Sequence, residues 1–302
     1  MSPTIVRTLI SVGALHELAT EHADDVVIFD ARFDLASPES GHREYVAGHL
    51  PGARYLHLDA DLSGVKSGHN GRHPLPDREQ LARTFGAHGL SSKQRPQVVV
   101  YDAQGGMFAS RAWWLLRWLG YERVAVLDGG IQAWLAAGLS LDTTEPARRS
   151  ATFLAADSLV GTVDAAAVFE NLLVGARVLI DARAPDRYRG ENETLDPVGG
   201  HIPGARNRFF KDNLAAQGTF KSAAELREEF ERILQGAQAA TTIHQCGSGV
   251  TACHNLLAME VAGLSGATLY PGSWSEWVAD RNRPIAKAAA EQGTSGTSEQ
   301  GV

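Results

Sequence analysis

A cysteine stands at the head of a loop in which glycines alternate with other residues, in the run HQCGSGVT at positions 244–251. Gly247 and Gly249 can adopt positive φ angles, so successive backbone N–H groups can point toward one spot. A helix that begins directly after the loop adds a partial positive charge there. Anionic sulfur is stabilised in such a setting, and the pattern therefore predicts that Cys246 is a thiolate nucleophile.

Both cysteines of the chain have an alternative explanation as core residues, because free cysteine is among the most buried residue types. For Cys246 we favour the nucleophile, since a core cysteine needs no glycine on either side of the serine that follows it. Cys253 lies within an apolar pattern at helical spacing, where packing explains it. We expect Cys253 to be a core residue first and a resolving thiol second.

The elements that must position Cys246 occur twice in the chain. The run FDAR at 29–32 returns as IDAR at 180–183, and GHLPGAR at 48–54 returns as GHIPGAR at 200–206. In each copy apolar strands alternate with helices, which predicts βα units on a mostly parallel sheet. We therefore expect two α/β domains, each a mostly parallel sheet flanked by helices.

The two copies differ at the position of the nucleophile, because Asp102 in the first copy aligns with Cys246 in the second. We expect a first domain without a nucleophile at 1–142, a linker at 143–158, a catalytic domain at 159–287 and a disordered polar tail at 288–302. Ligand sites of open α/β sheets lie outside the carboxyl ends of the strands, so the site is expected at the Cys246 loop.

Composition limits the kinds of partner. The chain has 302 residues, with 28 Lys and Arg against 35 Asp and Glu, a net charge of −7, so it repels polyanions and we expect no nucleic acid partner. No apolar run approaches the ~20 residues that span a bilayer, and the N-terminus lacks a signal-peptide pattern. We expect no membrane partner, a cytoplasmic location and reduced thiols. Two cysteines also exclude a cysteine-rich zinc site.

These motifs together resemble those of the tandem-domain rhodanese-type sulfurtransferases, over roughly residues 5–284. The two GHxPGA motifs, the order of an inactive and then an active copy, and the CGSGVT loop carry the resemblance. The loop is similar to the 3-mercaptopyruvate type, whereas the thiosulfate type usually has two basic residues directly after the cysteine. The resemblance implies two tandem rhodanese-like domains.

The resemblance also implies a reaction. Cys246 takes sulfur from a small anionic donor, holds it as a persulfide and passes it to cyanide or to a thiol acceptor such as thioredoxin, without a metal or an organic cofactor. The loop N–H groups would hold the persulfide, which makes Gly247, Gly249, Val250 and Thr251 candidate substrate-binding residues.

A Ser-His-Asp arrangement for proton transfer is implied by the same resemblance, at Ser248, His73 and Asp59. A serine hydroxyl oriented by histidine could protonate the enolate of pyruvate that forms as the carbon–sulfur bond breaks. The alternatives are that Asp59 caps a turn and that His73 is a loop histidine with a solvated ring.

Arginines are the candidates for binding the anionic end of the donor. Arg187 matches a family arginine with this role, and Arg189 is a possible helper, although residues two apart on an extended segment face opposite ways. Animal mercaptopyruvate enzymes have a second arginine shortly afterwards, where this chain has Asp196. That carboxylate disfavours a second anion, and it could mean another donor or a compensating contact from Arg189 or Arg72.

Other functions remain as alternatives. Thiosulfate is the second candidate donor, and a non-enzymatic persulfide carrier or thiol redox sensor is the third possibility. A phosphatase needs Cys-x5-Arg, but the sixth residue after Cys246 is Ala252. We assign no metal site to the repeated His49 and His201, which we interpret as turn residues. The tryptophans at helical spacing are expected in the core and the domain interface: Trp113, Trp114 and Trp118.

Overall fold

The computed structural model describes residues 5–147 and 150–287, so the predicted tail at 288–302 lies outside the described residues. The two halves of the chain form one five-stranded sheet each, in the orders β1-β5-β4-β2-β3 and β6-β10-β9-β7-β8. The second order repeats the first element by element, and every pairing between these strands is parallel. The predicted fold class is confirmed.

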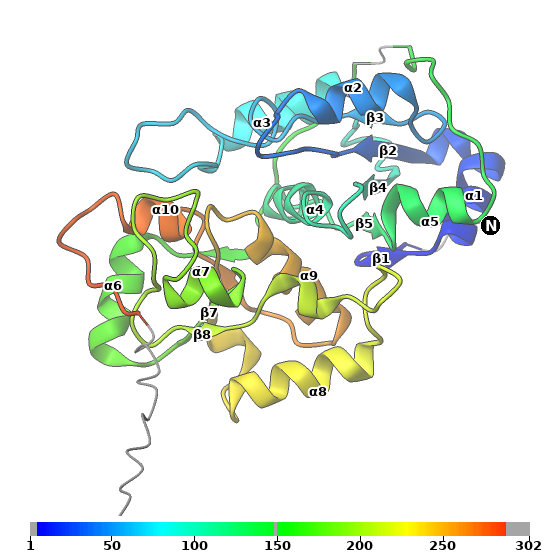
Figure 1. Ribbon diagram of the computed structural model, residues 1–302. Helices are drawn as coiled ribbons and strands as arrows, with labels where there is room; N and C mark the ends of the chain where they lie inside the picture. The colour runs from blue at the N-terminus through cyan, green and yellow to red at the C-terminus, as the bar shows by residue number, and fades with distance from the viewer. Residues whose placement is uncertain (1–4, 148–149, 288–302) are drawn as a thin grey trace, which may run out of the picture.

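Helices alternate with the strands in both halves (Figure 1). The elements of the first half are β1 Leu9–Ile10, α1 Val12–Glu21, β2 Val26–Asp30, α2 Ser40–Ala47, β3 Arg54–Tyr55, α3 Arg78–Ala87, β4 Gln97–Tyr101, α4 Ala109–Trp118, β5 Val124–Leu127 and α5 Gly130–Ala136. Those of the second half are β6 Gly161–Thr162, α6 Ala165–Val174, β7 Val178–Asp181, α7 Pro185–Arg189, β8 Arg206–Asn207, α8 Ala223–Leu234, β9 Thr242–Gln245, α9 Thr251–Val261, β10 Thr268–Leu269 and α10 Ser273–Trp277. Within the described parts of the predicted linker, 143–147 and 150–158, the chain forms neither helix nor strand.

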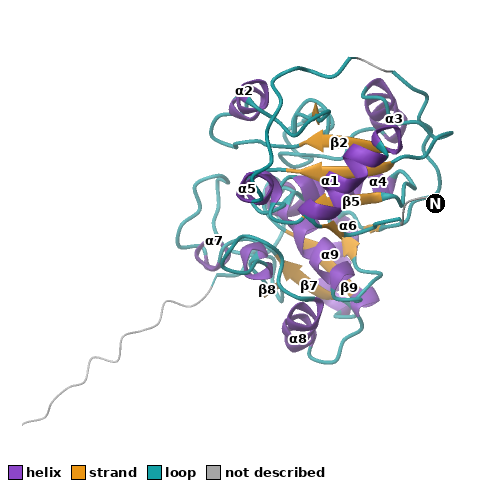
Figure 2. Ribbon diagram, turned by 90° about the vertical axis from the view of Figure 1, so that its right-hand side faces the viewer, coloured by secondary structure: helices purple, strands orange, loops and turns teal. Residues whose placement is uncertain are grey.

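Helices α4 and α9 join the two halves. They pack against each other at the centre of the molecule (Figure 1), and a single apolar cluster runs from the first sheet through both helices to the second half. Figure 2 shows the sheets one above the other, with α2 and α3 above the upper sheet and α8 below the lower one. Trp113 and Trp114 are buried on α4 and line a small gap with Leu256 and Leu264, which confirms their predicted place in the core and interface.

The repeated motifs build the same turn in each half. Asp30 binds the guanidinium of Arg32, which donates to the Gly48 carbonyl, and Asp181, Arg183 and Gly200 repeat this arrangement. Similarly, the Nδ1 atoms of the two motif histidines lie 2.8 Å from tyrosine carbonyls, and their rings stack on the same tyrosines: His49 on Tyr45 and His201 on Tyr188. These histidines are turn residues, as expected. No helix in the described ranges is long and apolar enough to cross a membrane.

His244 on β9 is fully buried, and within the described chain neither ring nitrogen has a hydrogen-bond partner. Burial lowers the pKa of His244 to about 3. In the unfolded chain the pKa of this histidine is about 6.5, so between about pH 6.5 and about pH 3 the unfolded state binds a proton at His244 and the folded state does not. The contribution of the neutral His244 ring to the free energy of unfolding is therefore fully present above about pH 6.5. It decreases as the pH falls toward about 3, by up to ~1.4 kcal/mol per pH unit.

Replacing His244 by valine is expected to remove that part of the pH dependence, because an apolar side chain suits both the strand and the site. Urea unfolding at about pH 7.5 and about pH 5.5 would measure it. His254→Val is the comparison: burial lowers the pKa of His254 to about 4, so this variant should also lose part of the pH dependence. Because the His254 ring nitrogens contact Asn213 and the Gly105 carbonyl, His254→Val should in addition lose stability at the higher pH, which His244→Val should not. An unchanged pH dependence in His244→Val would contradict the interpretation.

Candidate active site

Cys246 directly follows β9 and is 2% exposed. Its N–H donates to Ser273 Oγ at 3.1 Å, while its carbonyl accepts from the Trp274 N–H and the Gly247 carbonyl accepts from the Ser275 N–H, each at 3.0 Å. Helix α10 thus holds two carbonyls of the loop, and the Ser248 nitrogen lies 3.5 Å from Cys246 Sγ. The helix α10 therefore fixes the shape of the loop.

The loop N–H groups form a cradle for an anion. In the described part of the chain, the N–H groups of Gly247, Gly249, Val250 and Thr251 donate to no protein acceptor. Thr251 also begins α9, so the positive end of that helix adds to them. These groups can stabilise a thiolate or a persulfide.

The first half shows what such a cradle binds. Asp102, at the position equivalent to Cys246, is fully buried after β4. Its carboxylate accepts four backbone N–H groups at 2.8–3.0 Å, from Gln104, Gly106, Phe108 and Ala109. In the first half the loop N–H groups are thus occupied by the Asp102 carboxylate. In the second half the equivalent residue is Cys246, whose thiol faces a loop with N–H groups left free within the described chain.

Gly249 has a φ of +76°, and a Cβ at this position would collide with the Pro271 carbonyl oxygen. We expect Gly249→Ala to displace the loop from α10 and to reduce both stability and turnover. Gly204 is the matched control, since its φ is +75° but an added Cβ meets nothing within 4 Å. Gly204→Ala should cost only the backbone penalty of about 1–2 kcal/mol, with normal activity. Urea unfolding and turnover of both variants would check this, and equal losses would refute it.

Arg111 is a functional candidate that the sequence analysis missed. It lies on α4 of the first half and is fully buried. Nη1 donates to the Gly249 carbonyl and Nη2 to the His73 carbonyl, both at 3.1 Å. Burial lowers the pKa of Arg111 and the two nearby cysteines oppose this, but a guanidinium stays charged in proteins. A positive charge therefore lies behind the Cys246 loop and ties it to the segment that carries His73.

His73, Ser248 and Asp59 come together although they are far apart in sequence. His73 Nδ1 lies 2.7 Å from Ser248 Oγ, and His73 Nε2 lies 3.6 Å from Asp59 Oδ1. Asp59 also pairs with Lys66 Nζ at 2.8 Å. His73 is 4% exposed, so the alternative of a solvated ring is wrong, and burial lowers its pKa to about 3 against the opposing charge of Asp59. The ring is neutral at neutral pH and can accept the proton of Ser248.

Two arginines reach the loop, and only one of them is among the predicted substrate-binding residues. Arg187 and Arg72 line the space at Gly247, whereas Arg189 lies outside it, where it is half-exposed and pairs with Glu191 at 2.7 Å. Pro185–Arg189 is the helix α7 rather than an extended segment, but residues two apart on a helix are about 200° apart around its axis, so Arg187 and Arg189 still face nearly opposite ways, as expected. The sequence offered Arg189 or Arg72 as the second arginine that compensates for Asp196, and the structure brings Arg72 to the site.

A cavity of about 50 Å³ lies over Cys246, and both halves line it. The first half contributes Leu35, Met107 and Phe108 besides Arg72 and His73, and the second contributes Leu195 besides Arg187 and the loop residues. Ser248, Val250 and Thr251 are among those loop residues. This cavity therefore gives access to the thiol through a narrow space between the halves.

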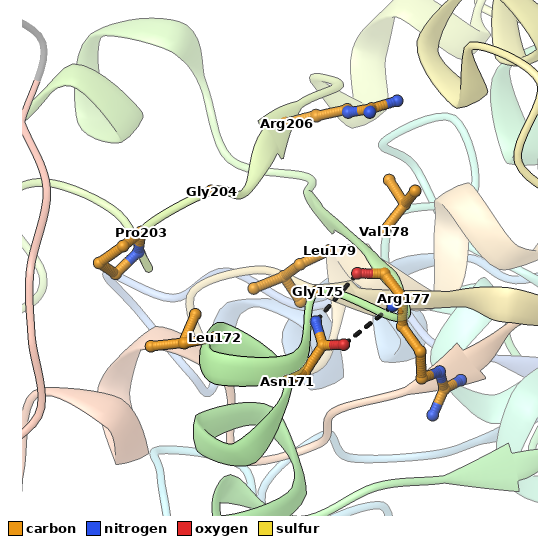
Figure 3. A pocket seen from close by; sticks show the side chains of 9 residues that line it. All are labelled: Asn171, Leu172, Gly175, Arg177, Val178, Leu179, Pro203, Gly204 and Arg206. Carbon is orange, nitrogen blue, oxygen red and sulfur yellow. Dashed lines mark hydrogen bonds between the residues drawn. The ribbon is translucent and has the colours of Figure 1, made fainter.

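A larger cavity of about 360 Å³ lies at the start of β7 (Figure 3). Asn171 and Arg177 line this cavity. The Asn171 side-chain amide donates to the Arg177 carbonyl and accepts from the Arg177 N–H, each at 2.9 Å. It faces the amino end of β7, whereas ligand sites in open α/β sheets lie at the carboxyl ends. Chemistry is therefore assigned to the smaller cavity at Cys246.

Comparison with known proteins gives consistent matches. The sequence family of the rhodanese-like domain matches this chain twice, at residues 14–137 and 165–280. The chain is similar to a Pseudomonas aeruginosa protein, provisionally named 3-mercaptopyruvate sulfurtransferase, with 47% identity over 87% of this chain and 92% of that one. A Mycobacterium tuberculosis protein, provisionally named thiosulfate sulfurtransferase SseB, is 39% identical over 88% and 93%. The solved structure of the Escherichia coli 3-mercaptopyruvate sulfurtransferase SseA superimposes with a TM-score of 0.76 at 30% identity, covering 89% of this chain and 99% of that one.

Proposed function

The chain belongs to the rhodanese-like sulfurtransferases, and from that premise we propose that it moves sulfur from 3-mercaptopyruvate through a persulfide on Cys246. The observation that carries the choice of donor is the 2.7 Å contact between Ser248 Oγ and His73 Nδ1, beside the thiol. The relatives that are named for mercaptopyruvate support the same donor.

In the first step the Cys246 thiolate attacks the thiol sulfur of the donor. The sulfur–sulfur bond forms as the carbon–sulfur bond breaks, which gives a Cys246 persulfide and the enolate of pyruvate. The enolate carbon must gain a proton, and the persulfide loses one when it becomes an anion in the N–H cradle. The 2.7 Å contact between Ser248 Oγ and the neutral ring of His73 supports Ser248 as the group that passes this proton.

In the second step an acceptor thiolate or cyanide attacks the outer sulfur of the persulfide, and the Cys246 thiolate leaves. A thiol acceptor such as thioredoxin gives an acceptor persulfide, and cyanide gives thiocyanate. We propose that this takes place in the cytoplasm, where thiols stay reduced. Burial of Cys246 at the base of the cavity supports a persulfide that is shielded from water.

Thiosulfate is the second candidate donor, and the similarity to a protein with a thiosulfate sulfurtransferase name favours it. Attack on its outer sulfur releases sulfite, which needs no proton. The structure gives less support to a redox sensor, because Cys253 is fully buried and donates to the Gly249 carbonyl. Burial also raises the pKa of Cys253 to about 12, so it stays a thiol and is poorly suited to resolve an oxidised Cys246.

The donor is tested by kcat/KM for 3-mercaptopyruvate and for thiosulfate in one assay with cyanide as acceptor, with Cys246→Ser as the blank. We expect a large preference for mercaptopyruvate. A preference for thiosulfate would keep Cys246 as the nucleophile but discard the proton transfer through Ser248. Activity with neither donor would favour the carrier or the sensor.

A further inference from the structure

Two guanidinium groups from opposite halves of the chain converge beside the nucleophile. A Cβ on Gly247 would lie 2.8 Å from Arg72 Nη2, and 3.5 and 3.7 Å from the terminal nitrogens of Arg187. Arg72 belongs to a loop of the first half, where its backbone N–H is fixed by Ser275 Oγ at 3.0 Å, and Arg187 lies on α7. Since Gly247 is adjacent to Cys246, any anion beside the sulfur meets both cations.

One buried carboxylate holds both arginines. The side chain of Asp196 is 3% exposed, its Oδ1 contacts Arg72 Nη1, and its Oδ2 lies 3.3 Å from Arg187 Nη2. The Glu193 side chain, 4% exposed, accepts from Nε and Nη2 of Arg187. Among the described residues, Arg72 Nη2 and Arg187 Nη1 have no hydrogen-bond acceptor. Each guanidinium therefore keeps one nitrogen free for a ligand at the Gly247 side.

The charges of this cluster cancel. Its three cations are Arg72, Arg183 and Arg187, and its three anions are Asp181, Glu193 and Asp196, with Arg183 paired to both Asp181 and Glu193. Arg111, behind the loop, is balanced by the Cys246 thiolate, so a monoanion bound beside the cluster leaves one uncompensated negative charge and a dianion leaves two. Since the carboxylates are buried, water screens this repulsion only weakly, and the second charge is penalised.

We propose that Arg72 and Arg187 together bind the anionic end of the sulfur donor, and that Asp196 selects donors by charge, accepting monoanions and rejecting dianions. The inference rests on the proposed sulfur transfer and narrows its substrate class. It explains how a site with two arginines would bind a single carboxylate better than thiosulfate. Asp196 acts through the arginines as a specificity-determining residue.

The test separates charge from chemistry with two sulfane donors: thiosulfate, a dianion, and methanethiosulfonate, a monoanion of similar shape. The wild type should prefer methanethiosulfonate. In Asp196→Asn, kcat/KM for thiosulfate should rise on the order of tenfold and clearly more than that for methanethiosulfonate. Arg72→Met should raise KM for both donors. Glu191→Gln is the matched control, because Glu191 is an exposed carboxylate outside the cavity, and it should leave both values unchanged.

A binding readout is measured in parallel: protection of Cys246 from alkylation by methanesulfonate and by sulfate, which are unreactive. Protection by methanesulfonate alone in the wild type, and by both anions in Asp196→Asn, would support the inference even if no donor turned over, in which case only the proposed function would fail. Equal changes for both charges in Asp196→Asn, or a loss of thiosulfate activity, would overturn it. So would Arg72→Met with unaltered KM values.

Discussion

Replacing Cys246 by serine is expected to abolish sulfur transfer with every donor and acceptor, by more than about 10³-fold. A hydroxyl stays protonated at neutral pH and forms no persulfide, so neither step can begin. The change is small in volume, and the loop is held from α10 by Ser273, Trp274 and Ser275, so the fold should persist. Turnover with cyanide as acceptor and urea unfolding of the same variant would measure both effects.

Cys253→Ser is the matched control. Its sulfur is fully buried and contacts the Gly249 carbonyl, an interaction that a hydroxyl can also make, so turnover should remain close to that of the wild type. If Cys253→Ser were inactive and Cys246→Ser active, the nucleophile would be misassigned. If both were inactive, the two thiols would act together, as in a sensor.

Replacing Ser248 by alanine is expected to lower kcat for 3-mercaptopyruvate by about 10²–10⁴-fold, the usual size of a proton-transfer contribution, while thiosulfate turnover changes little. The difference follows from the leaving groups: the enolate of pyruvate needs a proton, and sulfite does not. His73→Asn should give the same selective loss, because His73 Nδ1 is the partner of Ser248 Oγ. Steady-state kinetics with both donors would measure the two variants.

Thr251→Ser is a suitable control for these variants, because Thr251 lines the same cavity, and among the described residues its hydroxyl has no hydrogen bond to His73, whose Nδ1 contacts Ser248. It should change neither donor selectively. An equal loss with both donors in Ser248→Ala would mean that the serine maintains the loop and does not move a proton. Since the pKa of His73 is about 3, the mercaptopyruvate profile should also lack a transition from this residue near pH 6.5.

The fold could be predicted from the sequence because the duplication is visible in short motifs. The FDAR and IDAR runs and the two GHxPGAR runs each predict a strand end and a turn, and the structure places them at β2 and β3 and again at β7 and β8. The substitution of Asp102 for Cys246 could likewise be seen without coordinates. Its consequence, a carboxylate that fills its own N–H cradle, could not, because four N–H groups converge only once the loop is folded.

The candidate site was predictable only where its residues are contiguous. The spacing of glycines identified Cys246, whereas the roles of Ser248, His73 and Asp59 came from the family resemblance alone. Arg111 was missed because it lies in an apolar helical pattern 138 residues from its partner Gly249. Ser273 was missed because its role depends on a left-handed φ of +55° that turns its hydroxyl toward the Cys246 N–H.

The choice between Arg72 and Arg189 could not be made from the sequence either. The sequence indicated that Asp196 was unusual, and it offered Arg189 and Arg72 as equal candidates for a compensating contact. Only the folded chain decides between them, because it pairs Arg189 with Glu191 at an exposed position and Arg72 with Asp196. Pairing between Arg72 and Asp196, across the two halves and 124 residues apart, is a property of the assembled fold.

The central claim is that Cys246 itself carries the transferred sulfur. It is tested most directly by a single-turnover experiment, in which the protein is mixed with 3-mercaptopyruvate without an acceptor and analysed by intact mass and peptide mapping. We expect a mass gain of one sulfur atom on the peptide that contains Cys246, formed together with an equal amount of pyruvate and lost when cyanide is added. Release of pyruvate without sulfur on Cys246, or a stable disulfide between Cys246 and Cys253, would contradict it.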